Sequence, residues 1–227
     1  MNFVEREKFL FSILGQISGK TDFVVIGGYA INAYVLPRFS IDCDIVVQNK
    51  KNLAQIQKQL EKAGFAERAS GKLPYSGEFL VMASNKPQAT FDILAGAVED
   101  RLSGTIFPAE MIFTNSSKRT IFGKGSPIQI KCHVVNPELL FLMKACPART
   151  TDIRDLFMLS ALKLDTAKMM ELSKEVKAKI DAEKILSKIG SKPFLNALQG
   201  VHGKLPQEQY KKTLAQARAN IEKLDEA

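Results

Sequence analysis

Two aspartates, Asp42 and Asp44, stand two positions apart in the segment IDCDIVV, residues 41–47. Side chains alternate between the two faces of a strand, so both carboxylates point to one side while apolar neighbours fill the other. Two carboxylates on an otherwise apolar strand repel each other and lose solvation. A divalent cation relieves that cost, because Mg²⁺ prefers oxygen ligands such as carboxylates and phosphates. A wet strand end relieves it too, so the spacing alone leaves both interpretations open.

A glycine pair and a polar segment precede the aspartates. Gly27 and Gly28 follow an apolar run that predicts a short buried strand over residues 22–27. Glycine lets the backbone approach a phosphate closely, and the N–H groups that follow it attract anions. Arg38 can pair with phosphate oxygens and Ser40 can donate a hydroxyl hydrogen bond. Taken singly, the glycine pair is more commonly a plain tight turn, and an arginine such as Arg38 is by default a solvated surface charge.

A third carboxylate, Asp92, lies in the segment TFDILA, which predicts another strand over residues 90–95. Three carboxylates suit two metal ions, one that activates an attacking hydroxyl and one that binds the leaving pyrophosphate. Asp92 is also a candidate acceptor for the proton of the nucleophile. These residue types together favour the handling of a triphosphate.

The fragments VIGGYA, RFSIDCDIV and FDI resemble the nucleotidyltransferase superfamily that includes DNA polymerase beta-like enzymes. They are most similar to the AbiE-type toxin nucleotidyltransferases. The resemblance implies a nucleoside triphosphate substrate and Mg²⁺ or Mn²⁺ as cofactor. It assigns catalysis and metal binding to Asp42, Asp44 and Asp92, and nucleotide binding to Gly27, Gly28, Arg38, Ser40 and Lys144. Gly28 departs from the family pattern, because many relatives have serine there and would gain a hydroxyl contact to phosphate.

Lys144 precedes an acidic and basic cluster formed by Asp152, Arg154 and Asp155. AbiE-type enzymes are similar in placing a lysine, and later an Arg-Asp pair, on helices that face the nucleotide. The resemblance implies that Lys144 contacts the triphosphate and that Asp155 orients it. The alternatives are a helix lysine whose stem lies along apolar surface and a local salt bridge within the cluster.

The expected reaction moves a nucleoside monophosphate from the triphosphate to an acceptor hydroxyl. The resemblance leaves the acceptor open between an RNA such as a tRNA end, a protein side chain and a small molecule. It also implies a toxin with a cognate antitoxin as partner. Two further hypotheses stay open: an inactive protein of the same fold that binds a nucleotide, RNA or a partner, and a scaffold whose aspartates are simply solvated.

The composition is that of an ordinary globular protein. The 227 residues are 45% hydrophobic and 25% charged, with a net charge of +8 that suits a polyanionic partner. Three cysteines without a CxxC pair indicate reduced, buried thiols. No apolar run approaches the roughly 20 residues that span a bilayer. We therefore expect no membrane contact and a cytoplasmic location.

The periodicity changes near Asn136 and predicts an α+β fold: a small mixed-sheet domain over residues 1–135, then a helical bundle over 136–227. In the first part we expect a helix over 29–36, ended by Pro37, and a hairpin from 78–83 and 90–95. The other elements expected there are helices over 3–18 and 51–63 and a strand over 41–47. Residues 111–114, 119–122 and 128–135 add either more short strands or one strand with loops.

Overall fold

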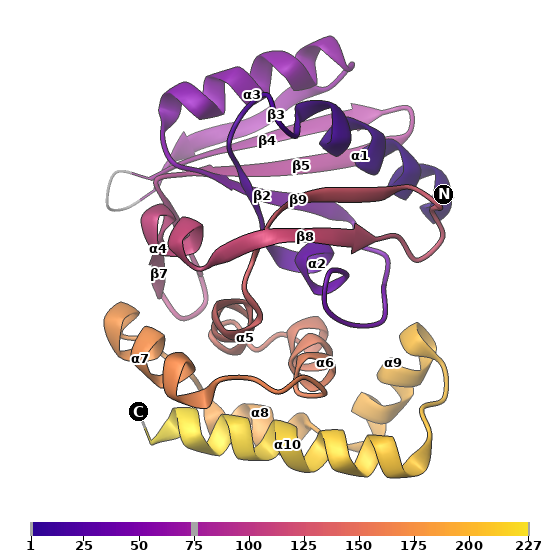
Figure 1. Cartoon of the computed structure of the whole chain (residues 1–227), viewed down its shortest axis with the longest axis vertical. Coiled ribbons are helices and arrows are strands. Elements are labelled where there is room, and N and C mark those ends of the chain that lie inside the picture. Colours follow the sequence, from indigo (N-terminus) through magenta and orange to yellow (C-terminus); the bar gives the residue numbers. More distant parts are fainter. Residues whose placement is uncertain (1, 74–76, 227) are drawn as a thin grey trace. The chain divides into compact units, whose positions relative to one another are not determined.

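The computed structural model describes residues 2–73 and 77–226 and has the expected α+β architecture (Figure 1). The chain forms two compact units, which are described separately below. The described residues of Met1–Ala33, Pro37–Glu99 and Phe107–Asn136 form the first unit, and those of Tyr34–Leu36, Asp100–Ile106 and Pro137–Ala227 form the second.

A seven-stranded mixed sheet organises the first unit, in the order β3-β4-β5-β2-β1-β9-β8. The β2–β5 and β1–β9 pairs are parallel, and the β3–β4, β4–β5, β1–β2 and β8–β9 pairs are antiparallel. The strands are β1 (Val24–Val25), β2 (Asp42–Val47), β3 (Ala66–Lys72), β4 (Glu78–Asn85), β5 (Gln88–Ala95), β8 (Ser116–Phe122) and β9 (Gln129–Val135). Separately, β6 (Ala97–Glu99) pairs with β7 (Ile106–Pro108).

Helices α1 (Phe3–Ile17) and α3 (Lys50–Lys62) pack on one face of this sheet. The Asn2 side chain accepts from the first-turn N–H groups of α1, and Asn49 does the same for α3. Between these helices and the sheet lies an apolar core that includes Leu14, Ile45, Ile56 and Phe91, each fully buried. Burial of this face fixes the register of β2 and β5, because a slip of one residue would bring their aspartates into the core.

The second unit is helical and begins its main run with α5 (Pro137–Ala145) and α6 (Thr150–Leu159). Helix α10 (Gln207–Asp225) packs on α6, α7 (Thr166–Val176) and α8 (Ala182–Lys188). The ring of Phe157 lies 5.4 Å from the rings of both Phe194, on α9 (Lys192–His202), and Tyr210. These aromatic contacts join α6 to α9 and α10.

Two expected elements of the first unit differ in the structure. The helix predicted over 29–36 is α2 (Gly27–Ile31), which starts at the glycine pair and stops well before Pro37. It stops because the next residue, Asn32, bonds its side chain to the backbone of Arg38 and folds the chain back. The segment 111–114 is part of helix α4 (Ala109–Thr114), not a strand. Its short apolar run carries no periodicity that separates the two states.

Candidate active site

Strand β2 presents Asp42 and Asp44 on one face of the sheet, as the alternation predicts. Both are partly exposed, whereas Cys43 and Ile45 between and beside them are buried in the core. In the parallel β2–β5 pair, Asp44 lies directly opposite Asp92. Directly paired residues share a face, so all three carboxylates belong to the face of the sheet opposite α1 and α3.

The environment of Asp42 disfavours its charged form. Partial burial raises the pKa of this carboxyl above its ordinary value. The positive charge of Arg6, a hydrogen bond with Thr90 and the charge of Arg68 act in the opposite direction. Asp42 is therefore a carboxylate that a nearby cation would stabilise.

The glycine pair is packed directly against the polar side chains of the site. Gly27 has a φ of +65°, and a Cβ atom there would overlap the Asp44 carboxylate. A Cβ atom at Gly28 would overlap the Ser40 hydroxyl and lie 3.2 Å from an Arg38 guanidinium nitrogen. Only glycine fits both positions, so the turn, the carboxylate and the Arg38–Ser40 segment form one assembly.

Asn32 holds that segment in place, and sequence reasoning did not identify it. Its amide nitrogen donates to the carbonyl oxygens of Arg38 (2.9 Å) and Phe122 (3.1 Å), and its amide oxygen accepts from the Arg38 N–H (3.0 Å). The Tyr29 hydroxyl donates to the Ser40 carbonyl at 3.3 Å. The only sequence signal is a polar residue inside the apolar run YAINAYVL, which is too weak to predict this role.

Lys144, in the second unit, is bound by two carboxylates. Its ammonium lies 2.9 Å from Asp152 Oδ1 and 3.2 Å from Asp155 Oδ2. All three side chains are buried or nearly so. Arg154 points elsewhere and donates to the Ala197 carbonyl at 3.4 Å. The expected partnership of Lys144 with Asp155 is present, and Asp152 shares it; whether Lys144 also contacts a triphosphate stays a prediction.

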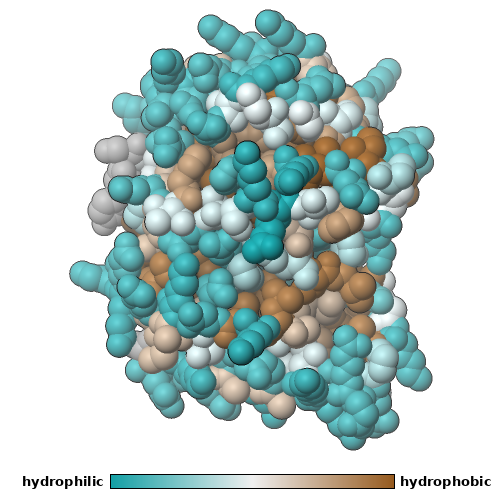
Figure 2. All heavy atoms as spheres, in the orientation of Figure 1, coloured by the Kyte–Doolittle hydropathy of each residue, from teal (hydrophilic) through white to brown (hydrophobic). Residues whose placement is uncertain are grey.

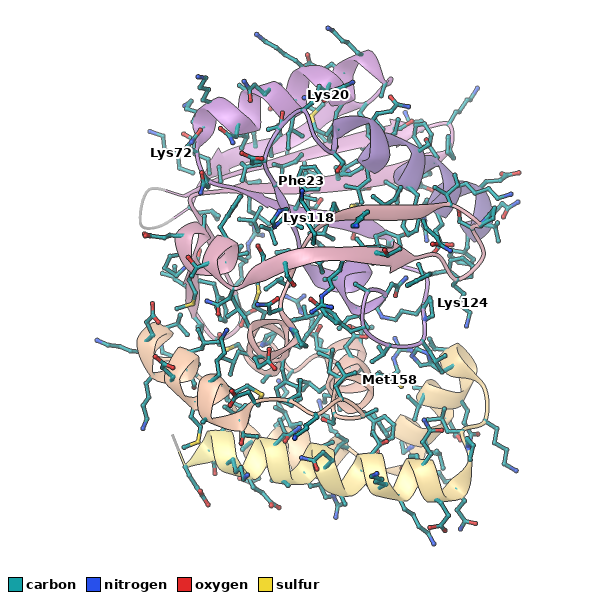
Figure 3. The ribbon with its side chains drawn as sticks, viewed as in Figure 1. Lys20, Phe23, Lys72, Lys118, Lys124 and Met158 are labelled. Atoms are coloured by element: carbon teal, nitrogen blue, oxygen red, sulfur yellow. The ribbon has the colours of Figure 1, made fainter. Side chains whose placement is uncertain are left out.

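The GKGSP segment, residues 123–127, forms a turn whose N–H groups already bind an anion. The buried carboxylate of Glu7 accepts from Lys124 N (3.1 Å), Gly125 N (2.8 Å) and Ser126 N (2.9 Å). The Lys124 side chain itself extends from this turn (Figure 3). An internal carboxylate therefore takes the place that a phosphate loop would offer to a ligand.

Across residues 2–73 and 77–226, no three His, Cys, Asp or Glu side chains are gathered closely enough to hold a metal ion. Within the same ranges, no helix has the length and apolar character that crossing a membrane requires. Hydrophilic side chains are spread over the face shown in Figure 2, with smaller apolar areas between them.

Comparison with known proteins places the chain in a family. A family model described as "Nucleotidyl transferase AbiEii toxin, Type IV TA system" matches residues 8–227. JHP933 from Helicobacter pylori has a similar fold, with 17% identity, a TM-score of 0.51 and coverage of 99% of this chain and 94% of that one. A second H. pylori structure, titled as a candidate nucleotidyltransferase, has 17% identity, a TM-score of 0.50 and coverage of 98% and 96%. No curated protein matches. The match over almost the whole chain shows that it belongs to the AbiEii family of nucleotidyltransferase toxins.

Proposed function

We propose that this chain transfers a nucleoside monophosphate from a nucleoside triphosphate to an acceptor hydroxyl, with Mg²⁺ or Mn²⁺ as cofactor. The family supports the reaction class, and one observation supports the site. Asp44 lies opposite Asp92 on the same face of the sheet, and Gly27 packs against the Asp44 carboxylate. The glycine turn and the carboxylates of Asp44 and Asp92 thereby meet in the first unit, and Asp42 lies on the same face of the sheet two residues from Asp44.

Asp42, Asp44 and Asp92 are the residues that would hold the divalent cation. Their oxygen donors suit a hard cation, and their placement on one face suits a shared ion. The raised pKa of Asp42 fits the same role, because a bound cation would offset the cost of burying its charge. When bound, the cation neutralises negative charge on the triphosphate and on the leaving pyrophosphate.

The chain's own residues supply positioning and proton transfer. Arg38 and Ser40, held against Gly28, orient the phosphates. The acceptor oxygen forms a bond to the α-phosphorus as the bond from that phosphorus to the bridging oxygen breaks, and pyrophosphate leaves. Asp92 accepts the proton from the acceptor hydroxyl. Each step uses a residue of the first unit.

The family indicates a class of partner for this chain, and it leaves several classes of acceptor open. A toxin of a toxin–antitoxin pair has a cognate antitoxin, which we propose as the partner of this chain. The acceptor is an RNA, a protein or a small molecule bearing a free hydroxyl. The products of the test below distinguish these classes by their size and by their sensitivity to ribonuclease or protease.

The test is transfer of label from each α-labelled nucleoside triphosphate to a cell extract, with Mg²⁺ and with a chelator. Asp44→Asn removes a carboxylate of the site at nearly constant shape and should abolish labelling. Asp22→Asn is the matched control, because Asp22 is an exposed aspartate of the same unit outside the site. Labelling that survives Asp44→Asn, or that persists in chelator, would contradict the proposal.

A further inference from the structure

Edge strand β3 contains a bulge at Arg68. In its antiparallel pairing with β4, Glu67 lies opposite Met82 and Ala69 lies opposite Val81, so Arg68 has no residue facing it. An extra residue of this kind leaves the regular alternation, and bulges re-aim side chains beside active sites. Because of the bulge, the regular alternation of side chains along β3 does not determine the face of the sheet to which Arg68 belongs.

The neighbours of Arg68 identify the two faces of the sheet at this edge. Glu67 belongs to the α3 side, because it accepts from the amide of Gln57 at 3.4 Å. Ala69 belongs to the other side, since the register continues from it through Val81 to Asp92. One side of the bulge thus leads directly across the sheet to the carboxylates.

Arg68 acts electrostatically toward the carboxylate face. Its positive charge is one of the groups that lower the pKa of Asp42. The row that leads from β3 to Asp42 passes through Ala66, Ala83 and Thr90, all small side chains. Arg68 is exposed, and among the ion pairs of the described residues none involves it. Arg68 is therefore an exposed cation whose charge acts on Asp42 across a row of small side chains.

Arg38 provides a cation on the opposite flank. Asn32 ties the Arg38 backbone to the carbonyl of Phe122, which lies on β8 at the far edge of the sheet from β3. The carboxylates on β2 and β5 thus have one arginine on the β8 side and another on the β3 side. A guanidinium fork matches phosphate geometry, so both arginines suit a substrate that carries several phosphate oxygens.

We propose that Arg68 is a further substrate-binding residue, which takes a phosphate group at the β3 side of the carboxylates. The inference rests on the proposed function, because it adds a contact to the same site. The phosphate belongs either to the nucleotide or to the acceptor, and both sources present the same chemistry to a guanidinium. Arg68 is exposed on an edge strand, so its replacement leaves the core intact.

The first experimental arm measures binding of each Mg²⁺–nucleoside triphosphate by calorimetry. The second measures binding of inorganic phosphate, followed by phosphorus NMR, to protein saturated with a non-reactive nucleotide analogue. Arg68→Ala is compared with wild type, and Arg68→Lys tests whether charge alone is enough. Lys72→Ala is the matched control, because Lys72 is an exposed cation of the same strand, opposite Glu78 and on the α3 side (Figure 3).

Loss of a charge-assisted phosphate contact should weaken binding about tenfold in Arg68→Ala, with partial recovery in Arg68→Lys and none of this loss in Lys72→Ala. Loss in the first arm identifies a nucleotide phosphate, and loss only in the second identifies an acceptor phosphate. Wild-type affinity of Arg68→Ala in both arms would overturn the inference. Wild-type binding without transfer to any acceptor would contradict the proposed reaction alone, whereas a wild type that binds neither probe would overturn both.

Discussion

Lys144 is the side chain whose removal should destabilise the second unit most clearly. Its ammonium lies between Asp152 and Asp155, whose side chains are 4% and 0% exposed, and its own side chain is 12% exposed. Lys144→Met keeps the apolar stem and removes the charge, which leaves two buried carboxylates without their cation. Breaking a buried pair in this way costs about 3–5 kcal/mol. Helical circular dichroism during denaturant unfolding measures the loss.

Two further variants show whether unpaired charge is the cause. Lys211→Met removes a lysine whose exposed pair with Glu208 spans 3.7 Å, and should cost about 0–1 kcal/mol. Lys144→Met combined with Asp155→Leu removes the most buried carboxylate as well, and should recover part of the lost stability, because only Asp152 is then left without its cation. A loss below about 1 kcal/mol for Lys144→Met would refute the reasoning, because a buried pair cannot be broken so cheaply.

The double variant also decides the functional role of Lys144. Because it is expected to fold, its affinity for a Mg²⁺–nucleoside triphosphate can be compared directly with that of wild type. Unchanged affinity would mean that Lys144 only anchors α5 to α6. A large loss in a folded protein would support the triphosphate contact that the family resemblance implies.

Three more outcomes are expected. Gly27→Ala should lower stability by about 1–2 kcal/mol, because its φ is +65°, and should abolish transfer by displacing Asp44, as unfolding and activity assays would show. Asn32→Ala should cost about 2–4 kcal/mol in an unfolding titration and raise the KM for nucleotide, because two hydrogen bonds with the Arg38 backbone and one to the Phe122 carbonyl are lost; an unchanged KM would count against it. The three thiols should resist a disulfide reagent at pH 8 until the protein unfolds, since burial raises the pKa of Cys146 to about 11 and all three are buried; rapid labelling of folded protein would contradict this.

Local sequence patterns predicted the elements that have one face in the core and the other face outside it. Strand β2 alternates between core and site, and α3 repeats its buried residues at helical spacing. The hairpin of β4 and β5 also follows from two apolar runs and the turn between them. In each case one face is buried, so apolar residues recur in the sequence at the spacing of that element.

Elements that do not bury one face in a regular pattern were not predicted. Strand β3 is exposed along nearly its whole length, and its sequence AERASGK carries no alternation. It forms because β4 offers it an edge, and no local pattern records that partner. The bulge at Arg68 depends on the same pairing, so the sequence could not indicate that the alternation of the strand is interrupted at this arginine.

The same contrast holds for the site: the sequence suggested its residue types but not the strand register that brings them together. The types of Asp42, Asp44 and Asp92 suggested a shared carboxylate site, but Asp92 follows Asp44 by 48 positions. Their meeting requires β5 to lie parallel to β2 with Asp44 opposite Asp92, and a slip of one residue would place Asp92 in the core. Because the apolar residues that alternate with these aspartates forbid that slip, the core packing against α1 and α3 also sets the positions of the carboxylates. The geometry of the proposed site and the stability of the fold therefore depend on the same register, and a core substitution that shifts β5 should reduce the proposed activity before it unfolds the protein.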